Sequence, residues 1–365
     1  MGLTAMDQSL PTLPLGHMLQ GRYRTLRKLG SGGFGSVYLA VDTRLWGRNV
    51  AIKELSDPSP AAQRLFEQEA AVLACLSHPG LVRVSDFFQE GRSHYLVMDY
   101  VDGLDLLELA IEAEKTGKLL PIADVCDWMV QVCDAVAYLH RQSPPIIHRD
   151  IKPNNIRLNS AGRAILVDFG IAKIDPRAKT EVMAKATSEG YSPPEQYAGV
   201  TGTDARSDVY ALGATLYALL AVKPPPDSFQ LLVAGAPLTP LRRLNAGVSS
   251  ALEAVVQKAM SLKAQDRYRD GGDLLAALSA VVGSSEDVGR GPSGPGPAAH
   301  ELDGDGLDVM ATGALCPGCG RLARVGARYC PHCGRQLPLS TKCPNCGTRN
   351  RPGARFCHRC QSRLS

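Results

Sequence analysis

Apolar and polar residues alternate along the first part of the chain in the manner of β-strands. The strand-like runs cover residues 22–30, 36–42, 49–55, 81–89 and 94–101, with turn residues between them. One segment, at about residues 61–76, instead carries the helical spacing of apolar positions. This part of the chain therefore predicts a β-rich region that contains a single helix.

Helical spacing dominates from about Ile122 onward. Two sets of apolar residues each share one helix face: Val125, Met129, Val132, Val136 and Leu139, and later Val209, Leu212, Leu216 and Leu220. This spacing ends near Val282. A β-rich region followed by an α-rich region predicts an α+β fold of two lobes with a cleft between them.

Residues 283–315 lack any apolar spacing and predict a flexible linker. Residues 283–300 are mostly Gly, Pro and Ser, and an acidic stretch follows them. The DGDG string in that stretch invites comparison with a calcium-binding loop. However, the twelfth position counted from Asp303 is Ala314, where such a loop requires a Glu. A solvated linker is the better interpretation.

Composition predicts a packed protein that does not cross a membrane. The chain has 365 residues, of which 44% are hydrophobic and 21% charged. No apolar run reaches the ~18–20 residues that a membrane span needs. The N-terminus lacks the features of a secretory signal, and Met6 stands where a myristoylation site needs Ser or Thr. We therefore expect a cytosolic protein.

Positive charge and cysteine are concentrated in residues 316–365. This tail contains ten Lys or Arg and no Asp or Glu, so the net charge of +4 leaves −6 for residues 1–315. Eight of the eleven cysteines also lie in the tail. The others, Cys75, Cys126 and Cys133, are expected to pack in the core, because free Cys is commonly buried.

A glycine-rich stretch matches the pattern G-x-G-x-x-G-x-V. It consists of Gly30, Ser31, Gly32, Gly33, Phe34, Gly35, Ser36 and Val37. A dinucleotide-binding loop of similar spacing joins a strand to a helix, whereas a strand follows here. The stretch therefore predicts a loop between two strands, whose backbone N–H groups approach a triphosphate and whose tip is Phe34.

Charged residues further along suit phosphoryl transfer. Lys53 lies on a predicted strand and can bind nucleotide phosphates, and either Glu67 or Glu69 can pair with it, the second being favoured by its spacing from the turn at 78–82. Residues 148–155 read HRDIKPNN and residues 168–170 read DFG. These strings supply an Asp to accept a hydroxyl proton, a Lys beside the moving phosphate, and an Asn and an Asp to hold magnesium.

From about Tyr23 to Val282 the sequence resembles a protein kinase domain, in particular the bacterial Ser/Thr kinases of eukaryotic type. The matching motifs are GSGGFGSV, VAIK, Glu69, HRDIKPNN, DFG, SPPE at 192–195, SDVYALG at 207–213 and DRY at 266–268. The resemblance implies an ATP-dependent protein serine/threonine kinase. It also implies a bilobal protein kinase fold over residues 21–282, preceded by an extension of residues 1–20.

The resemblance further implies roles for individual residues. Asp150 would orient the substrate hydroxyl and accept its proton, and Lys152 would neutralise the γ-phosphoryl group. Asn155 and Asp168 would bind Mg²⁺ or Mn²⁺. ATP would contact the glycine stretch, the Lys53–Glu69 pair, and an adenine pocket and hinge made of Ala51, Met98, Asp99, Tyr100 and Val101. The buried structural ions would be Glu195, Arg267 and Asp208.

Two positions depart from the family pattern. Ser188 stands where the family usually has Thr, and the usual APE triplet reads PPE. Arg149 precedes the catalytic Asp, and such an arginine often pairs with a phosphate on the activation loop. The hydroxyls available there are those of Thr180, Thr187 and Ser188. We expect autophosphorylation at Thr180 or Thr187 above all.

The cysteines of the tail have the spacing of zinc sites. Each set of four consists of two C-x-x-C pairs ten residues apart, and the second set repeats the first at an offset of 27 residues. The sets are Cys316, Cys319, Cys330 and Cys333, and Cys343, Cys346, Cys357 and Cys360. Four thiolates predict a closed structural Zn²⁺ site in each set, with an iron cluster as the weaker alternative. The tail resembles the double zinc ribbons of many bacterial proteins.

The role of the tail stays open between several interpretations. A basic module could bind a protein partner, the acidic kinase domain or nucleic acid, or simply cap the chain. Protein docking or regulation is favoured, since basic charge alone is weak evidence for nucleic acid. The alternative to an active kinase with protein substrates is a scaffold that binds ATP without transfer. Such scaffolds usually lose Lys53, Asp150 or Asp168, and none is lost here.

Overall fold

The computed structural model describes most of the first part of the chain and four short strands of the tail. The described residues are 13–32, 35–55, 59–168, 189–197, 203–235 and 237–286, and the strands at 314–315, 322–323, 341–342 and 349–350. The chain forms two compact units, residues 1–292 and residues 293–365. Among the described residues, none of the helices combines the length and the apolar character that a bilayer crossing requires.

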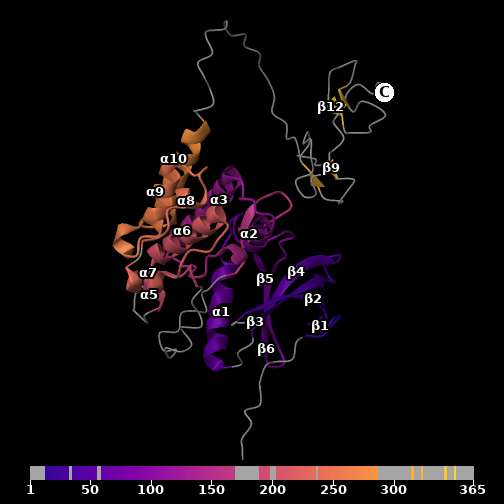
Figure 1. Ribbon diagram of the computed structural model, residues 1–365. Coiled ribbons are helices and arrows are strands. Elements are labelled where there is room, and N and C mark those ends of the chain that lie inside the picture. The colour runs from indigo at the N-terminus through magenta and orange to yellow at the C-terminus, as the bar shows by residue number, and fades with distance from the viewer. Residues whose placement is uncertain are drawn as a thin grey trace, which may run out of the picture. The chain divides into compact units, whose positions relative to one another are not determined.

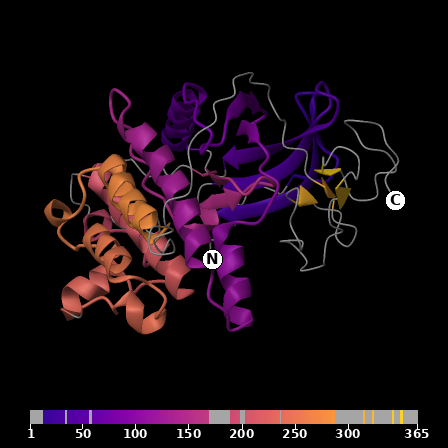
Figure 2. The same ribbon diagram turned by 90° about the horizontal axis from the view of Figure 1, so that it is seen from above.

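Six antiparallel strands form the sheet of the N-terminal lobe, in the order β1-β2-β3-β4-β6-β5. Their bounds are β1 (Met18–Leu19), β2 (Tyr23–Gly32), β3 (Gly35–Asp42), β4 (Arg48–Leu55), β5 (Val84–Glu90) and β6 (Ser93–Asp99). Helix α1 (Pro60–Ala74) packs against β5 and β6 (Figure 1, Figure 2). It begins at Ser59, whose side chain accepts the N–H of Ala62.

Alternation along β4 sends its side chains to the two faces of this sheet. Ile52 is fully buried on one face, in a cluster with Tyr23 and Val97. Ala51 packs on the other face, in the main core that also includes the helices of the C-terminal lobe. Because strand residues alternate with a period of two, Lys53 points to the same face as Ala51, toward the C-terminal lobe.

Helices make up most of the C-terminal lobe (Figure 1). Their bounds are α2 (Leu106–Lys115), α3 (Ile122–His140), α5 (Pro194–Tyr197), α6 (Ala205–Ala221), α7 (Ser228–Ala234), α8 (Leu241–Leu244), α9 (Ser250–Ala259) and α10 (Gly271–Glu286). Every residue of α6 from Ser207 to Leu220 is buried, because α3, α8, α9 and α10 all contact this helix. All faces of α6 are therefore buried, whereas its apolar spacing predicted one buried face.

A short hairpin joins the two lobes. β7 (Ile156–Leu158) and β8 (Ala164–Leu166) form an antiparallel pair. The N-terminal lobe contacts β8 through two backbone hydrogen bonds: Val82 N–H donates to Leu166 O at 3.0 Å, and Leu166 N–H donates to Gly80 O at 2.9 Å. The hairpin is thereby fixed to both lobes.

Three points of the sequence interpretation are settled by these elements. The predicted helix at 61–76 and the five predicted strands are confirmed, but α2 was not predicted, although Asp105 and Glu108 form a capping box at its start. Cys126 and Cys133 are buried, as expected. The expectation for Cys75 is wrong: this residue is exposed, because it caps the end of α1 rather than lying on the buried face of that helix.

The tail repeats one small antiparallel hairpin. The paired strands are β9 (Ala314–Leu315) with β10 (Leu322–Ala323), and β11 (Thr341–Lys342) with β12 (Arg349–Asn350). The second pair follows the first by 27 residues, which is the offset of the cysteine repeat. In each hairpin a C-x-x-C pair falls in sequence between the two strands, at 316–319 and 343–346. All eight cysteines of the tail lie outside the described residues.

A buried ion pair connects α5 to the segment before α10. The Arg267 side chain is fully buried and meets Glu195 at two points, with Nη1 2.7 Å from Oε1 and Nη2 3.1 Å from Oε2. Its remaining N–H groups donate to three backbone carbonyls, and Ser207 Oγ donates to Glu195. Burial raises the pKa of Glu195, but the hydrogen bonds from Arg267 outweigh burial and hold this pKa below its ordinary value.

Replacing Glu195 by Gln should lower the free energy of unfolding by roughly 3 kcal/mol at pH 7, because the Arg267 charge stays buried without its counter-ion. The carboxylate has a lowered pKa in the folded protein, so its contribution is complete above about pH 4.5, the ordinary value for Glu, and is lost as the pH falls further. Urea unfolding of both proteins should therefore show a constant difference between about pH 7 and 5.5 and a shrinking one below about pH 4.5. Glu112→Gln, at an exposed position of α2, is the matched control. Equal stability of the two variants at pH 7 would contradict the role of the pair.

Candidate active site

Lys53 of β4 lies where the two lobes meet. Its Nζ is 3.3 Å from Oε1 of Glu69 on α1 and 2.8 Å from Oδ1 of Asp168, which follows β8. The side chains of Lys53 and Glu69 are 7% and 1% exposed, whereas that of Asp168 is 46% exposed. The structure thus joins the strand, the helix and the hairpin at one ammonium group.

The carboxylates of Asp168 and Glu69 keep the buried Lys53 side chain protonated and positively charged. Burial by itself lowers the pKa of Lys53, but the carboxylates of Asp168 and Glu69 raise it above its ordinary value. Burial raises the pKa of Glu69, and the Lys53 ammonium opposes that rise. Glu67, the other candidate partner, lies elsewhere, with Oε1 3.5 Å from Nε2 of His94. Glu69 is therefore the residue that pairs with Lys53.

The glycine stretch forms the end of the β2–β3 hairpin. Strand pairing extends to Gly32 and Gly35, and the tip residues Gly33 and Phe34 lie outside the described residues. Ser31 pairs with the residue after Gly35. The strands predicted on either side of the glycine stretch are confirmed, and their pairing extends into the stretch as far as Gly32 and Gly35, while the loop at its tip stays a prediction.

Gly35 brings this hairpin unusually close to the strand that carries Lys53. Its φ is +157°, and a Cβ at this position would lie 1.9 Å from the backbone oxygen of Glu54. Glycine alone fits without moving the neighbouring strand. The base of the glycine loop is thus held against β4, one residue from Lys53.

The residues expected at the adenine pocket lie side by side on β4 and β6. Ala51 pairs with Met98 across the two strands, and both side chains are buried. Asp99 ends β6, and the chain continues through Tyr100 and Val101, of which Val101 is buried. Ala51 and Met98 form an apolar wall on β4 and β6, and the segment after Asp99 continues from it. A flat aromatic base is suited to such a wall.

Asp150 is held in place by hydrogen bonds from its own loop. The amide nitrogen of Asn155 donates to its backbone oxygen at 2.7 Å and to its carboxylate at 3.0 Å. Lys152 Nζ lies 3.1 Å from the other carboxylate oxygen, and the Asp150 N–H donates to His148 Nδ1 at 3.3 Å. A carboxylate fixed beside an ammonium group is suited to accept a proton while the cation neutralises developing negative charge.

The loop that carries Asp150 is attached to the C-terminal lobe by the fully buried Asp208 of α6. One carboxylate oxygen of Asp208 accepts the N–H of His148 and the other accepts the N–H of Arg149, each at 2.8 Å. Backbone N–H groups at this depth need an acceptor, and Asp208 provides one for both. The sequence indicated that Asp208 is structural, and the two bonds show what it supports.

His140 of α3 completes the surroundings of Asp208. Its Nε2 lies 2.9 Å from the carboxylate, and its Nδ1 accepts the N–H of Gly271 at the start of α10. Because Nδ1 is an acceptor, the ring proton lies on Nε2 and is donated to Asp208. Residues of three helices, α3, α6 and α10, therefore support the loop that carries Asp150.

Arg149 adopts a left-handed backbone conformation, with φ +65°. Its N–H is bound by Asp208, and its Nε donates to Thr203 Oγ1 at 2.9 Å. Burial lowers the pKa of the guanidinium, and Asp208 opposes this effect. The hydroxyls predicted as phosphorylation sites lie outside the described residues: Thr180, Thr187 and Ser188.

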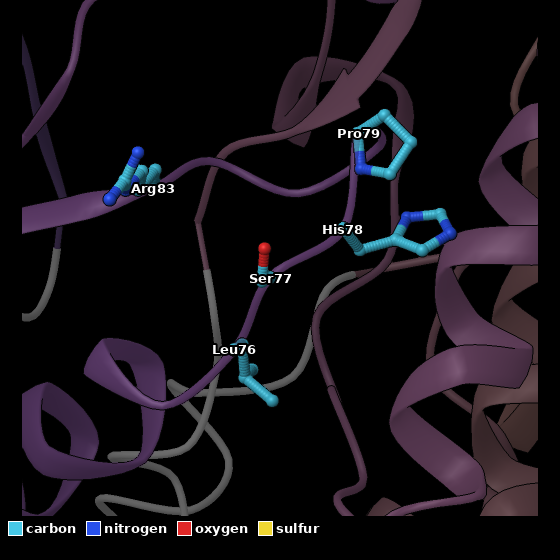
Figure 3. Close-up of a pocket in the computed structure, with 5 residues that line it drawn as sticks. All are labelled: Leu76, Ser77, His78, Pro79 and Arg83. Carbon is cyan, nitrogen blue, oxygen red and sulfur yellow. The ribbon is translucent and has the colours of Figure 1, made fainter.

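The end of α1 is anchored on α3 by His78. The His78 ring stacks on Tyr138, with centroids 5.1 Å apart, and its Nε2 lies 3.2 Å from Asp134 Oδ2. Figure 3 shows the ring turned toward a neighbouring helix, and Gly80 N–H donates to its Nδ1. A cavity of about 220 Å³ beside this loop is lined by Leu76, Ser77, His78, Pro79 and Arg83. This cavity includes none of the site residues, and the anchor matters because it fixes the helix that carries Glu69.

Two described side chains are suited to hold a divalent cation. The amide nitrogen of Asn155 is committed to Asp150, so its oxygen is the atom left for a cation. Asp168 offers a carboxylate that is about half exposed. Carboxylate and amide oxygens are the ligands that Mg²⁺ and Mn²⁺ prefer. The donor set therefore fits the expected metal.

Comparison with known proteins identifies two families. Residues 23–264 match the protein kinase domain, and residues 316–361 match the double zinc ribbon. The chain is 33% identical over 320 residues to the serine/threonine-protein kinase pkn2 of Myxococcus xanthus, covering 81% of this chain and 37% of that protein. It is 35% identical over 278 residues to the serine/threonine-protein kinase PknB of Mycobacterium leprae, covering 72% and 43%. The chain thus spans about two fifths of the length of these relatives.

A solved structure has the same fold. PpkA-294 in its apo form superposes with a TM-score of 0.63 at 29% sequence identity, covering 73% of this chain and 99% of that one. This agreement confirms the α+β fold of two lobes that the sequence predicted.

Replacing Asp208 by Asn should loosen the loop that carries Asp150, because an amide offers one acceptor oxygen where two backbone N–H groups and His140 donate to the two oxygens of a carboxylate. The free energy of unfolding should fall by roughly 1–3 kcal/mol, and hydrogen exchange followed by mass spectrometry should show faster exchange in the peptide that contains residues 148–149. Asp124→Asn, at an exposed position of α3, should change neither quantity. Unchanged exchange in the Asp208 variant would show that the loop does not depend on this carboxylate.

Proposed function

The chain belongs to the protein kinase family and also carries a double zinc ribbon, and from this premise we propose that it transfers the γ-phosphoryl group of ATP to Ser and Thr hydroxyls of protein substrates. The observation that best supports transfer is the Lys53 ammonium in contact with both Glu69 and Asp168. A scaffold that only binds nucleotide is the alternative. A scaffold would have no need of the second group of residues, in which Lys152 and Asn155 hold the Asp150 carboxylate.

The N-terminal lobe positions the nucleotide in this proposal. Lys53 pairs with phosphate oxygens, and Glu69 keeps its ammonium group in place. The backbone N–H groups of the glycine loop cover the phosphates, while the base lies against Ala51 and Met98. Positioning of this kind supplies much of the rate enhancement in phosphoryl transfer.

The C-terminal lobe carries out the transfer. The substrate hydroxyl oxygen attacks the γ-phosphorus, the bond from that phosphorus to the β–γ bridging oxygen breaks, and ADP leaves. Asp150 accepts the hydroxyl proton, and Lys152, 3.1 Å from this carboxylate, neutralises charge on the phosphoryl group. Asn155 and Asp168 would hold Mg²⁺, which supplies positive charge at the phosphate oxygens when it is bound.

We further propose that the enzyme phosphorylates its own activation segment, at Thr180 or Thr187 or at Ser188. Arg149 supports this proposal, because its guanidinium is partly buried and makes its described side-chain contact with a neutral hydroxyl, that of Thr203. A phosphate would give this cation an anionic partner through charge-assisted hydrogen bonds.

For the tail we propose two structural Zn²⁺ ions and a docking or regulatory role. The repeated hairpins at 314–323 and 341–350 support one metal site in each repeat, because each brackets a C-x-x-C pair. Ten basic residues without an acidic one suit an acidic protein partner. Binding of nucleic acid is the second candidate, on the same charge.

Asp150→Asn should abolish transfer, with a loss of at least ~10²–10⁴-fold, because the amide cannot accept the hydroxyl proton. Protein incubated with ATP and Mg²⁺ is assayed for phosphate incorporation into a Ser/Thr peptide library and, by mass spectrometry, into its own residues 171–195. Wild-type enzyme should modify both, and Asp150→Asn neither. Asp124→Asn is the matched control and should behave as wild type. Nucleotide binding without any transfer by the wild type would instead favour the scaffold.

Elemental analysis should find two zinc ions per chain. Cys319→Ser and Cys346→Ser should each reduce the content to one ion, since each cysteine belongs to a different set of four thiolates. Cys75→Ser, outside both sets, should leave two. One ion in the wild type, or iron in place of zinc, would contradict the proposed sites.

A further inference from the structure

The turn between β3 and β4 presents the most exposed large apolar side chain of the described residues. Trp46 is 98% exposed, and its neighbour Leu45 is 40% exposed. Tryptophan is highly buried on average, because its large indole ring is costly to leave in water. A fully exposed indole at the tip of a turn therefore requires a physical reason.

The turn keeps its shape without any contribution from the indole. Asp42 at its base is buried and accepts two hydrogen bonds from Arg22, with Nη2 2.6 Å from Oδ2 and Nε 3.0 Å from Oδ1. Bonds within the turn or to the Arg22 carbonyl use the backbone N–H groups of Thr43, Arg44, Leu45, Gly47 and Arg48. The tip, residues 43–48, is thus a fixed feature of the surface, and its backbone donors are largely committed.

The backbone at Trp46 favours a different residue. Its φ is +48°, in the left-handed region, where glycine is free of strain and asparagine is tolerated. Either residue would complete the turn without exposing apolar surface to water. Neither the turn nor the core accounts for the indole, so its position indicates a partner.

Positive charge surrounds this tip. Residues 13–55 carry seven Lys or Arg and two acidic residues, a net charge of +5, whereas residues 1–315 as a whole carry −6. The two acidic residues, Asp42 and Glu54, are both buried. The exposed charged side chains of this stretch are therefore all cations: Arg24, Arg27, Lys28, Arg44 and Arg48. Within the described residues, Arg48 is the one member of this set that forms an ion pair, with Asp99.

Strand register places one of these cations on the face toward which the tip turns. Met18, Arg24 and Val41 are successive cross-strand partners on β1, β2 and β3, so their side chains share one face of the sheet. A Cβ at Gly47 would lie 3.6 Å from Cγ1 of Val41, which shows that the turn folds back over this face. Met18 and Arg24 are both exposed. An apolar and a cationic side chain therefore lie on the same face as the tip.

We propose that this tip binds a lipid bilayer with anionic head groups, and that Trp46 and Leu45 enter the boundary between head groups and acyl chains. Indole rings favour that boundary, because one part of the ring is apolar and its N–H is polar. Arg44 and Arg24 would meet the negative charge of the head groups. Charge complementarity thus selects the kind of membrane, and the apolar tip supplies the insertion.

A bilayer fits the tip better than a protein partner does. The backbone N–H groups of the turn are used internally, so the tip offers few hydrogen bonds of fixed direction. A fluid lipid surface requires none, since apolar burial and long-range attraction between charges are both non-directional. The inference goes beyond the proposed function, because Trp46, Leu45 and Arg44 belong to no part of the phosphoryl-transfer site.

Trp46 can report its own insertion, because the chain has one other tryptophan, the partly buried Trp128 of α3. In the full-length, zinc-loaded Trp128→Phe protein, mixed vesicles of phosphatidylglycerol and phosphatidylcholine should shift the Trp46 emission to shorter wavelength. Lipids brominated on their acyl chains should quench this emission. Vesicles of phosphatidylcholine alone should have neither effect at the same lipid concentration, since they lack net negative charge.

Sedimentation with the mixed vesicles measures the contribution of each side chain. Trp46→Ala should bind about tenfold more weakly or worse, from the loss of indole burial, and Arg44→Gln about fivefold more weakly. Val233→Ala, at an exposed position of α7, and Arg163→Gln, at an exposed position of the β7–β8 hairpin, are the matched controls and should bind as wild type. Without vesicles, all four variants should phosphorylate a Ser/Thr peptide at the wild-type rate.

Three outcomes would overturn the inference, and each would leave the kinase assignment standing. Trp46 emission that does not respond to the mixed vesicles would show that the tip does not enter the bilayer. Wild-type sedimentation of Trp46→Ala would assign any vesicle binding to other cations, such as those of residues 316–365. Quenching by single-stranded nucleic acid without a response to vesicles would assign the indole to base stacking instead.

Discussion

The buried ammonium of Lys53 is the constraint on which the two lobes depend. A cation in the interior needs opposite charge close by, because the protein replaces water poorly as a solvent for an ion. Glu69 and Asp168 meet this need from a helix and from a hairpin. Strand β4, helix α1 and the β7–β8 hairpin must therefore converge on one point. Gly35 lies against β4, so the base of the glycine loop is also held close to Lys53.

The C-terminal lobe follows the same rule with buried carboxylates. Asp208 accepts two backbone N–H groups of the catalytic loop and the ring N–H of His140, so the loop takes its shape from α6 rather than from its own sequence. Glu195 and Arg267 satisfy one another at the edge of this helix. The buried carboxylate thus satisfies backbone N–H groups of the loop that no helix or strand partner accepts.

The residues of the site, and Asp208 as a buried structural ion, were predictable from the sequence, whereas the contacts that Asp208 makes were not. Lys53 and Asp168 could be recognised because phosphoryl transfer requires those side chains, and spacing was sufficient to prefer Glu69 over its neighbour. The bonds from Asp208 join residues 59 and 60 positions apart through backbone N–H groups, which every residue carries and no sequence pattern marks. The exposure of Cys75 likewise depends on how the end of α1 meets the rest of the protein.

The anchor at His78 gives α1 the geometry of a lever. With a rise of about 1.5 Å per residue, Glu69 lies about 7.5 Å and Pro60 about 21 Å from the end of the helix at Ala74. A rotation of about 10° about that end moves Glu69 by about 1.3 Å and Pro60 by about 3.7 Å, on the same helical rise. The 3.3 Å contact between Glu69 and Lys53 does not survive such a step. A movement of several ångströms at the first turn of α1 therefore makes or breaks one ion pair, that between Glu69 and Lys53.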